Sequence, residues 1–429
     1  MRIVLLIVLM MFYAAFGAAG VRAASELGLG DEDPFAVLST RSAVNEKSER
    51  VKTEGSVYLK NVRSDLNSGS RINPDNRDPR LQDNLSVLET RLTLSDKLDT
   101  SAQWRWLFKG FNAISSARAP DGSLRDEARV DELFVDWKAA DWFASLGKRR
   151  INWGHAQGFN PVNVVVPPRD PLDPGRETEG QPMAWINRVS GAQAVDVVMT
   201  RNYDRAYLSD QNRWGLKWSL AAGKSDYALY YFDGQRDGDG RRMERMLGGS
   251  FSADIFPGVT LYMEAARFGA NNRNYYDASS LRINKSGAYW QAVAGSSVSL
   301  GSKRRVALEY FRNDQGYSKT ERLNYFRATD TQLASGADSA ISNDYFVTGM
   351  NRNYALVSYQ DEFRERYLLD VSALLPGDQS YLLRVQGKYA VSDRYELRMV
   401  LLHNNGANAS EFGNNRVSNV LELGLGISF

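Results

Sequence analysis

Apolar and polar side chains alternate in segment after segment of this sequence, from residue 54 to the last residue. In Ser101 to Lys109 every even position is apolar, and most odd positions are polar or charged. Neighbouring side chains of a β-strand point to opposite faces, so the pattern predicts strands with one apolar and one polar face. The same alternation occurs in Leu88–Leu94, Leu133–Trp137, Trp214–Leu220, Val259–Glu264, Leu383–Tyr389, Tyr395–Leu401 and Asn419–Phe429.

The links between these segments are alternately short and long. The short links are Ser95–Lys97, Ala139–Asp141, Ser190–Gly191, Ala222–Ser225, Phe256–Gly258, Gly301–Ser302, Gln360–Arg364 and Ser392–Asp393. The long links are Arg63–Asp83, Gly110–Asp126, Arg150–Gln181, Arg201–Asn212, Gly234–Met243, Gly269–Lys285, Asn313–Asn351 and Asn404–Arg416. One link, Pro376–Gln379, is short where a long one is due. Transmembrane β-barrels have this asymmetry, with short periplasmic turns and long external loops.

We therefore predict an all-β fold, a single transmembrane antiparallel β-barrel of about 18 strands with short periplasmic turns and long external loops. The strands run from near Gly55 to Phe429, and the hairpin of Met183–Val189 with Ala192–Thr200 has the weakest pattern. A soluble β-sandwich also alternates, but it must bury its apolar faces and seldom has so many long strands. An even number of strands places both termini on the periplasmic side.

The N-terminus has the features of a secretory signal peptide. Arg2 gives a basic start, Ile3 to Phe16 is apolar throughout, and residues 21–23 have the small-x-small pattern that a signal peptidase reads. The alternative is an uncleaved membrane anchor, but fourteen apolar residues are fewer than the about 20 that cross a bilayer. We predict a signal peptide at residues 1–23, a periplasmic N-terminal tail at 24–53 and the barrel at 54–429.

The last strand carries a separate signal. In Asn419 to Phe429 the odd positions are apolar, and the chain ends on an aromatic residue. This segment resembles the C-terminal assembly signal of Gram-negative outer-membrane proteins, in which a terminal aromatic, usually Phe, ends an alternating strand. The resemblance implies that the barrel-assembly machinery reads Leu425, Ile427 and Phe429, and that the protein lies in the outer membrane of a Gram-negative bacterium.

Composition excludes several other classes of protein. The chain has no Cys, which rules out disulfides and Cys-based zinc sites. Its net charge of +2 comes from 53 basic and 51 acidic residues, so nothing indicates a nucleic-acid partner. The two histidines, His155 and His403, lie far apart in sequence, and no Gly-x-Ser-x-Gly elbow marks a nucleophile. We therefore expect no enzymatic activity, no metal site and no cofactor.

The least strand-like stretch of the chain lies between Arg150 and Gln181. It contains five prolines, each of which removes an amide donor and fixes φ, so it can be neither a ladder strand nor a helix. A loop of this length in a compact fold is usually functional or disordered. Trp153, Phe159 and a run of valines make this one too apolar for ordinary disorder. We predict that loop 150–181 is packed and folds into the lumen.

A barrel of about 18 strands is wide enough to leave an aqueous channel unless something fills it. On the predicted register the polar face carries both signs of charge, so its selectivity is not obvious. The alternative is that these charges only solvate one another across the wall. The candidate pore or constriction residues are Arg91, Arg105, Glu132, Asp136, Arg149, Arg150, Trp153, Lys217, Glu264, Arg384 and Arg398. The same face carries Glu89, Arg305, Glu309, Asp370, Lys388 and Glu396.

One stretch resembles a known family. Glu132 to Trp137, followed by Leu146-Gly147-Lys148-Arg149-Arg150 and Trp153-Gly154, looks like the strand pair and the G-[KR]-x-R motif of alginate-export-type outer-membrane porins and related long-loop barrels. In such proteins a basic lumen suits an acidic polysaccharide. Acidic and basic lumen residues are near balance in this chain, so the resemblance supports a barrel and transport more than it supports alginate.

Two functions fit these observations. The first is an outer-membrane, porin-like channel for passive or substrate-selective transport of hydrophilic solutes, with its pore narrowed by the inward-folded Pro-rich loop. The second is a closed outer-membrane barrel with a structural or surface-binding role. A membrane-embedded hydrolase ranks below both. The expected partners are outer-membrane lipids and lipopolysaccharide, the barrel-assembly machinery, and a hydrophilic small solute or oligosaccharide.

Overall fold

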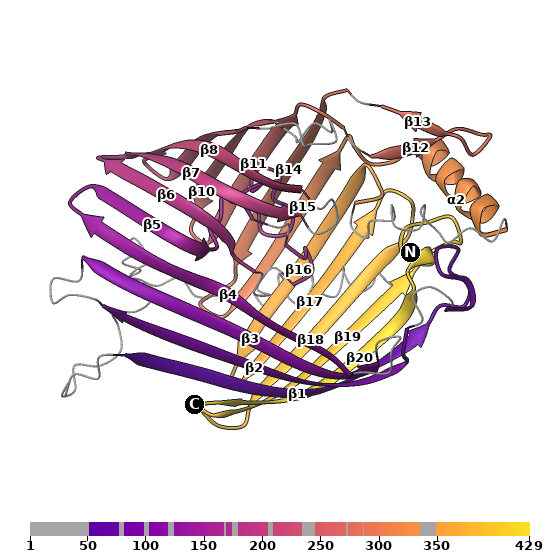
Figure 1. Ribbon diagram of the computed structural model, residues 1–429, viewed down its shortest axis with the longest axis horizontal. Coiled ribbons are helices and arrows are strands. Elements are labelled where there is room, and N and C mark those ends of the chain that lie inside the picture. The colour runs from indigo at the N-terminus through magenta and orange to yellow at the C-terminus, as the bar shows by residue number, and fades with distance from the viewer. Residues whose placement is uncertain are drawn as a thin grey trace. The chain divides into compact units, whose positions relative to one another are not determined.

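The computed structural model describes residues 51–76, 81–97, 103–118, 124–166, 169–173, 179–204, 209–233, 245–271, 273–285, 287–334 and 349–429. Within these ranges one antiparallel sheet of 18 strands forms (Figure 1). Its first strands are β1 (Lys52–Leu66), β2 (Asn84–Lys97), β3 (Trp104–Arg118), β4 (Leu124–Ala139), β5 (Trp142–Arg149), β6 (Gln181–Ser190), β7 (Gln193–Asp204), β8 (Ser209–Ala222), β9 (Ser225–Phe232), β10 (Met246–Phe256) and β11 (Val259–Phe268). The others are β14 (Tyr289–Ser299), β15 (Arg304–Asn313), β16 (Asn353–Phe363), β17 (Tyr367–Pro376), β18 (Tyr381–Ala390), β19 (Tyr395–Asn405) and β20 (Val417–Ser428).

The sheet closes on itself. Each strand pairs with its neighbours in sequence, and β1 pairs with both β2 and β20. In the closing pair, Tyr58 lies opposite Gly426 and Lys60 lies opposite Gly424. Closure removes the free edges of the sheet and makes it a barrel. The prediction of a single antiparallel barrel of 18 strands is confirmed, and the weakly patterned hairpin is the pair β6 and β7.

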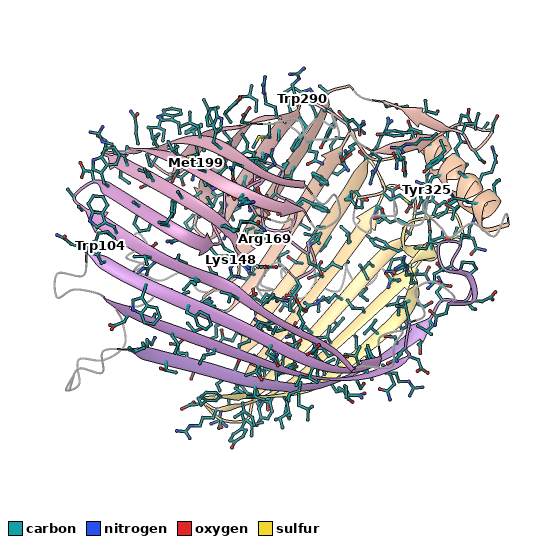
Figure 2. All side chains as sticks on the ribbon, in the orientation of Figure 1. Trp104, Lys148, Arg169, Met199, Trp290 and Tyr325 are labelled. Atoms are coloured by element: carbon teal, nitrogen blue, oxygen red, sulfur yellow. The ribbon has the colours of Figure 1, made fainter. Side chains whose placement is uncertain are left out.

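The two faces of the barrel wall differ as the alternation predicts. Large apolar side chains such as Trp104, Met199 and Trp290 are exposed, and Figure 2 shows them on the outer side of their strands. Charged side chains one position out of phase, such as Glu132 and Glu264, are buried on the inner side. Exposed apolar surface on this scale marks a membrane or protein interaction surface, because water disfavours it by about 25 cal/mol per Å².

Two predicted long links are wrong. β3 continues to Arg118 and β4 begins at Leu124, while β7 continues to Asp204 and β8 begins at Ser209. Most of Gly110–Asp126 and of Arg201–Asn212 is therefore strand. Polar residues such as Asn112 and Asp126 interrupt the apolar face in β3 and β4, so these strand ends lack the regular alternation from which the strands were predicted. The links that remain long include residues 150–180, 314–352 and 406–416.

A small layer of structure lies at the end of the barrel that carries the long links (Figure 1). It consists of the hairpin β12 (Asn274–Tyr276) with β13 (Arg282–Asn284), the helix α2 (Lys319–Ala334), and the short 3-10 turns η2 (Pro74–Asn76) and η4 (Phe412–Asn414). Tyr325 and Phe326 of α2 are fully buried against Tyr275, Tyr276 and Ile72. This packing fixes the helix on the hairpin.

The helix α2 was not expected, although its start carries a capping box. The backbone N–H of Glu321 donates to the Oγ of Ser318 over 3.3 Å, and the N–H of Ser318 donates to Oε2 of Glu321 over 2.7 Å. This reciprocal pair satisfies two amide groups that a helix start leaves unpaired. The sequence Ser-Lys-Thr-Glu at residues 318–321 was the available signal.

The predicted signal peptide and nearly all of the predicted tail fall on residues 1–50, outside the described residues. The predicted tail is too long at its end, because β1 begins at Lys52. In the described part of the chain, no helix combines the length and the apolar character needed to cross a membrane.

Candidate functional site

Residues 150–180 leave the wall at the end of β5, and Glu132 of β4 fixes this point. The backbone N–H of Arg150 donates to Oε1 of Glu132 over 3.0 Å, and the Arg150 guanidinium donates to Oε2 over 2.9 Å. Lys109 of β3 lies 3.6 Å from the same carboxylate. Glu132 is 7% exposed, so the two cations balance a charge that would be costly to bury alone.

The next residues of the loop are held by Glu264 of β11. Its carboxylate accepts hydrogen bonds from the backbone N–H groups of His155 and of Ala156, the second over 2.7 Å. Gly154, just before them, has φ +89°, and a Cβ there would meet Oε1 of Glu264 and lie 2.7 Å from Cγ2 of Val162. Glycine is required here because only its backbone adopts this φ freely and approaches the carboxylate so closely.

A second glutamate, Glu309 of β15, holds the following three residues. The N–H of Gln157 donates to Oε1 over 2.6 Å, and the N–H of Phe159 donates to Oε2 over 3.0 Å. The N–H of Gly158, between them, lies 3.1 Å from both oxygens. Tyr262 of β11 donates its hydroxyl to Oε1 over 2.8 Å. Two buried carboxylates thus bind five consecutive backbone N–H groups of the loop, an arrangement in which each charge-assisted hydrogen bond is strong.

Apolar packing joins the loop to the inner face of the wall in two clusters. In the first, Trp153 is 2% exposed, and its ring lies 5.7 Å from that of Tyr230 and 6.3 Å from that of Phe232. In the second, Phe159 stacks on Phe311 at 4.3 Å. The first cluster comprises Ile151, Trp153, Val162, Val165, Met183, Val198, Ala228, Tyr230, Phe232, Met246, Ala266, Phe268 and Tyr289. The second comprises Ala156, Phe159, Leu172, Tyr262, Val293, Phe311, Tyr354, Leu356, Leu374, Leu382 and Phe412.

The far part of the loop meets β18 and β19 through Asp173. Arg384 of β18 donates to Oδ2 of Asp173 over 2.9 Å and to the carbonyl of Leu172 over 3.3 Å. Arg398 of β19 lies 3.8 Å from the same carboxylate. The loop returns to its starting wall where the N–H of Gly180 donates to the carbonyl of Asp131 over 2.9 Å.

These contacts span the barrel. The loop starts at β5, and its Phe159 ring lies 5.5 Å from that of Tyr354 on β16. Counting round the sheet from β5, through β6 to β11 and then β14 to β16, gives nine steps, and counting the other way also gives nine. Because the sheet has 18 strands, β5 and β16 stand opposite each other. The loop therefore crosses the lumen from one wall to the other.

One part of the wall takes no part in the apolar packing of the loop. Among the described residues, neither cluster includes a side chain of β20 or of β1 to β4. This wall carries ion pairs instead: Lys60 lies 2.6 Å from Glu89 and 3.6 Å from Glu422, and Arg91 lies 3.9 Å from Glu89. Their side chains keep between 17% and 37% of their exposure. The apolar packing of the loop thus lies on one side of the barrel, whereas the wall of β20, β1 and β2 carries partly exposed charges.

Two titratable groups of the loop, His155 and Arg169, have shifted pKa values. Burial lowers the pKa of His155 below its ordinary value, so the ring is neutral at pH 7 and adds no charge. Burial and the neighbouring Arg150 lower the pKa of Arg169, which still carries its charge at pH 7. Figure 2 shows Arg169 towards the middle of the barrel. The described residues contain no group of three His, Asp or Glu side chains that could hold a metal ion.

The structure brings some of the predicted residues together and separates others. Arg105 and Arg149 both pair with Asp136, Arg105 over 2.7 Å. The Arg149 guanidinium also lies 4.4 Å above the ring of Phe134 and 5.1 Å from that of Trp185. Arg149 is therefore held within the wall, whereas its neighbour Arg150 lies at the root of the loop.

The other candidates fall into separate groups. Trp153 belongs to an apolar cluster, and Glu264 anchors the loop backbone. Arg384 and Arg398 meet the loop at Asp173, which the sequence analysis missed. Lys217 of β8 lies 3.8 Å from Asp196, and Arg91 belongs to the charged wall. Sequence alone offered no signal for Asp173, because its partners are more than 200 residues away and nothing in its own segment sets it apart.

The C-terminal residues close the barrel. The N–H of Phe429 donates to the carbonyl of Gly55 over 2.9 Å, and the N–H of Gly55 donates back over 2.9 Å. The Phe429 ring is 66% exposed, and Leu425 and Ile427 are also exposed on the outer face. Their role as an assembly signal stays a prediction.

Replacing Gly154 by Ala is expected to loosen the loop. Any non-glycine residue at φ +89° is strained, and the new Cβ would also clash with Glu264 and Asn160. Trypsin should cut within residues 150–180 at lower concentration than in the wild type. Gly191→Ala is the matched control, since φ there is +59° and nothing lies within 4 Å of an added Cβ. Equal behaviour of the two variants would show that the Gly154 contacts do not hold the loop.

Comparison with known proteins gives the class of fold. No family model matches the chain, and no curated protein matches it. Among solved structures it is similar to OccK1 (OpdK) of Pseudomonas aeruginosa, with a TM-score of 0.52 and 11% identity over 89% of this chain and 99% of that one. It is also similar to OccK8 (OprE) of Pseudomonas aeruginosa, with a TM-score of 0.53, 10% identity and coverage of 89% and 98%. OccAB1 of Acinetobacter baumannii has a TM-score of 0.55, 12% identity and coverage of 89% and 97%. The chain therefore has the fold of a closed, porin-type β-barrel.

Proposed function

We propose that the protein is an outer-membrane channel for hydrophilic solutes. It is exported with the cleaved signal peptide 1–23 and inserted by the barrel-assembly machinery, which reads Leu425, Ile427 and Phe429. Its apolar outer face is surrounded by outer-membrane lipids and lipopolysaccharide. The short turns then lie on the periplasmic side, and the layer that contains α2 lies outside, as in bacterial barrels of known topology.

One observation carries the proposal: residues 151–166 and 169–173 pack against the wall from β6 round to β18, and this apolar packing leaves out β20 and β1 to β4. A pore then remains between the loop and the charged wall of β20 and β1 to β4. Lys60, Glu89, Arg91 and Glu422 line it on the wall, and Arg169 and Asp173 line it on the loop. A constriction of this kind, with fixed charges in a narrow space, gives a channel its selectivity.

The balance of charges favours a class of solute. Acidic and basic groups face each other in pairs, so the pore offers hydrogen-bond donors and acceptors without a strong net field. A hydrophilic small solute or an oligosaccharide fits such a surface better than a highly charged polysaccharide, so the alginate-type resemblance does not extend to alginate. OpdK, one of the proteins of similar fold, has been solved with vanillate, and we propose solutes of comparable size here.

Planar-bilayer recording tests the proposal. The purified protein should give stepwise conductance increments, and Arg150→Gln should shift the reversal potential in a salt gradient towards cation preference. Removing one positive charge at the root of the loop lowers the barrier for cations in a narrow, low-dielectric passage.

Arg149→Gln is the matched control, because the Arg149 guanidinium is held against Asp136 and the ring of Phe134. It should leave the reversal potential unchanged and lower the stability of the barrel instead. Absence of any conductance would contradict the channel. It would favour the second candidate, a closed barrel whose tightly packed α2 and hairpin layer serves as a binding surface.

A further inference from the structure

A small polar cavity lies between the loop and the inner face of β15 to β17. Its volume is about 40 Å³, and a site for one water molecule needs about 10 to 15 Å³. The cavity therefore has room for two or three groups of that size. Gly158 and Pro171 of the loop form one side of it. The wall contributes a polar set, namely Arg305, Ser358, Gln360, Asp370 and Ser372.

The polar set forms two rows across neighbouring strands. In the first row, Arg305 of β15 lies opposite Gln360 of β16, and Gln360 lies opposite Asp370 of β17. In the second row, one level nearer the loop, Ser358 lies opposite Ser372. Neighbouring strands are about 4.8 Å apart, so the side chains of each row stand at a regular spacing along the wall of the cavity.

The wall uses only part of the hydrogen-bonding capacity of this set. Arg305 donates to Oε1 of Gln360 over 2.8 Å, which fixes the amide and leaves its Nε2 as a donor. Ser372 donates to Oδ1 of Asp370 over 3.1 Å. In the described part of the chain, Nε2 of Gln360, Oδ2 of Asp370 and the hydroxyl of Ser358 have no hydrogen-bond partner. The cavity thus offers a donor, an acceptor and a hydroxyl that can act as either.

The charges that line the cavity balance each other. Arg305 and Asp370 have opposite signs and stand at the two ends of one row. The third charged lining residue, Glu309, already accepts hydrogen bonds from the loop backbone. Beside the cavity, Arg384 is paired with Asp173 over 2.9 Å. An anion would meet Asp370 and a cation would meet Arg305, so a neutral polar group fits the cavity better than either.

We propose that this cavity binds two adjacent hydroxyl groups of a neutral sugar, with the rest of the sugar ring in the lumen. One hydroxyl accepts from Nε2 of Gln360 and donates to Oδ2 of Asp370, and its neighbour bonds to Ser358. Hydroxyl groups suit the site because each of them both donates and accepts. Pro171 and Leu356 provide apolar surface for the C–H groups of the ring. The inference rests on the proposed function, since it narrows the solutes of the channel to neutral sugars.

Saturation-transfer NMR tests the site on the full barrel, purified in a detergent without a sugar headgroup. The probes are glucose, glucuronate and glucosamine, which share one ring but are neutral, anionic and cationic at slightly acid pH. Glucose should show saturable binding. The two charged sugars should bind several-fold more weakly, because each of them places its charge next to a lining residue of the same sign.

Two substitutions in the cavity should weaken the binding of glucose. Gln360→Leu keeps the size of the side chain but removes its amide, so affinity should fall by about fivefold, the effect of one lost hydrogen bond. Ser358→Leu fills the cavity and should abolish saturable binding. Thr93→Leu is the matched control, because Thr93 of β2 shares the lumen face with Glu89 and Arg91 but does not line the cavity. Heat-modifiable gel mobility identifies the variants that fold, and either cavity variant is sufficient for the test.

Absence of saturable glucose binding in the wild type would overturn the proposal, as would an equal loss in Thr93→Leu and the cavity variants. Glucuronate or glucosamine that binds as tightly as glucose would also overturn it, because charge balance would then not select the occupant. None of these measurements depends on conductance. A protein that conducts but does not bind glucose contradicts only the sugar site, whereas one that binds glucose but does not conduct contradicts the channel.

Discussion

Deleting residues 154–180 and joining the ends with a short Gly/Ser bridge is expected to raise single-channel conductance several-fold. The deletion removes the part of the loop that crosses from β5 to β16, so the full width of an 18-stranded barrel opens to water. It also removes Val162 and Val165 from the apolar cluster that contains Met246 and Ala266, and so exposes part of that cluster. At about 25 cal/mol per Å² of newly exposed apolar surface, the variant should unfold at a lower temperature than the wild type. Planar-bilayer recording and heat-modifiable gel mobility measure the two effects.

A deletion outside the lumen serves as the control. The turn Ala278–Leu281 joins β12 to β13 and contributes to neither of the two clusters that pack the loop. Shortening this turn should leave the conductance unchanged. If the deletion of residues 154–180 inserts normally and conducts as the wild type does, the loop does not narrow the pore, and the surface-binding candidate becomes the better one.

An arginine in the middle of the outer apolar face should destabilise the barrel strongly. Leu229 of β9 is 59% exposed and lies between Tyr227 and Tyr231 on the outer face of the strand. Leu229→Arg is expected to cost about 2 to 4 kcal/mol of unfolding free energy, the range for a cation at the bilayer midplane. Urea titration of the protein in lipid vesicles measures this loss.

The hairpin of β12 and β13 offers a leucine of similar exposure for comparison. Leu281 is 66% exposed beside β13 and stands away from the barrel wall. Leu281→Arg should change the unfolding free energy by about 0.5 kcal/mol or less, as is usual for a surface substitution. If the two arginines cost the same, the apolar outer face is not in contact with lipid.

The strands of the barrel could be predicted because one face of each strand is apolar and the other is polar, which gives the sequence a period of two. Wherever one face is apolar and the other polar, as around Leu397 and Arg398, the alternation identified the strand and its register correctly. The same criterion failed at the ends of β3 and β4, where residues such as Asn112 and Asp126 make the outer face polar as well. The predicted number of strands was still correct, because the observed strands are only longer than predicted and none was added or lost.

The loop was predictable as a packed segment, but its attachments were not. Prolines and buried aromatics mark residues 150–181 as neither strand nor disordered. Its binding to Glu264 and Glu309 uses backbone N–H groups, which every residue except proline has, so no residue type in the loop identifies the partner. Glu309 was placed on the correct face, yet from sequence it did not differ from any other lumen carboxylate.

Anchoring by main-chain amides has an evolutionary consequence. The contacts of Glu264 and Glu309 are indifferent to the side chains at His155 and Gln157, both of which remain partly exposed. Mutations at these two positions can therefore change the exposed side chains of the loop, while its backbone keeps the same conformation. The two glutamates have no such freedom, since losing either one detaches several residues at once. Related barrels could therefore differ in the side chains of the loop while they keep the two glutamates that bind its backbone.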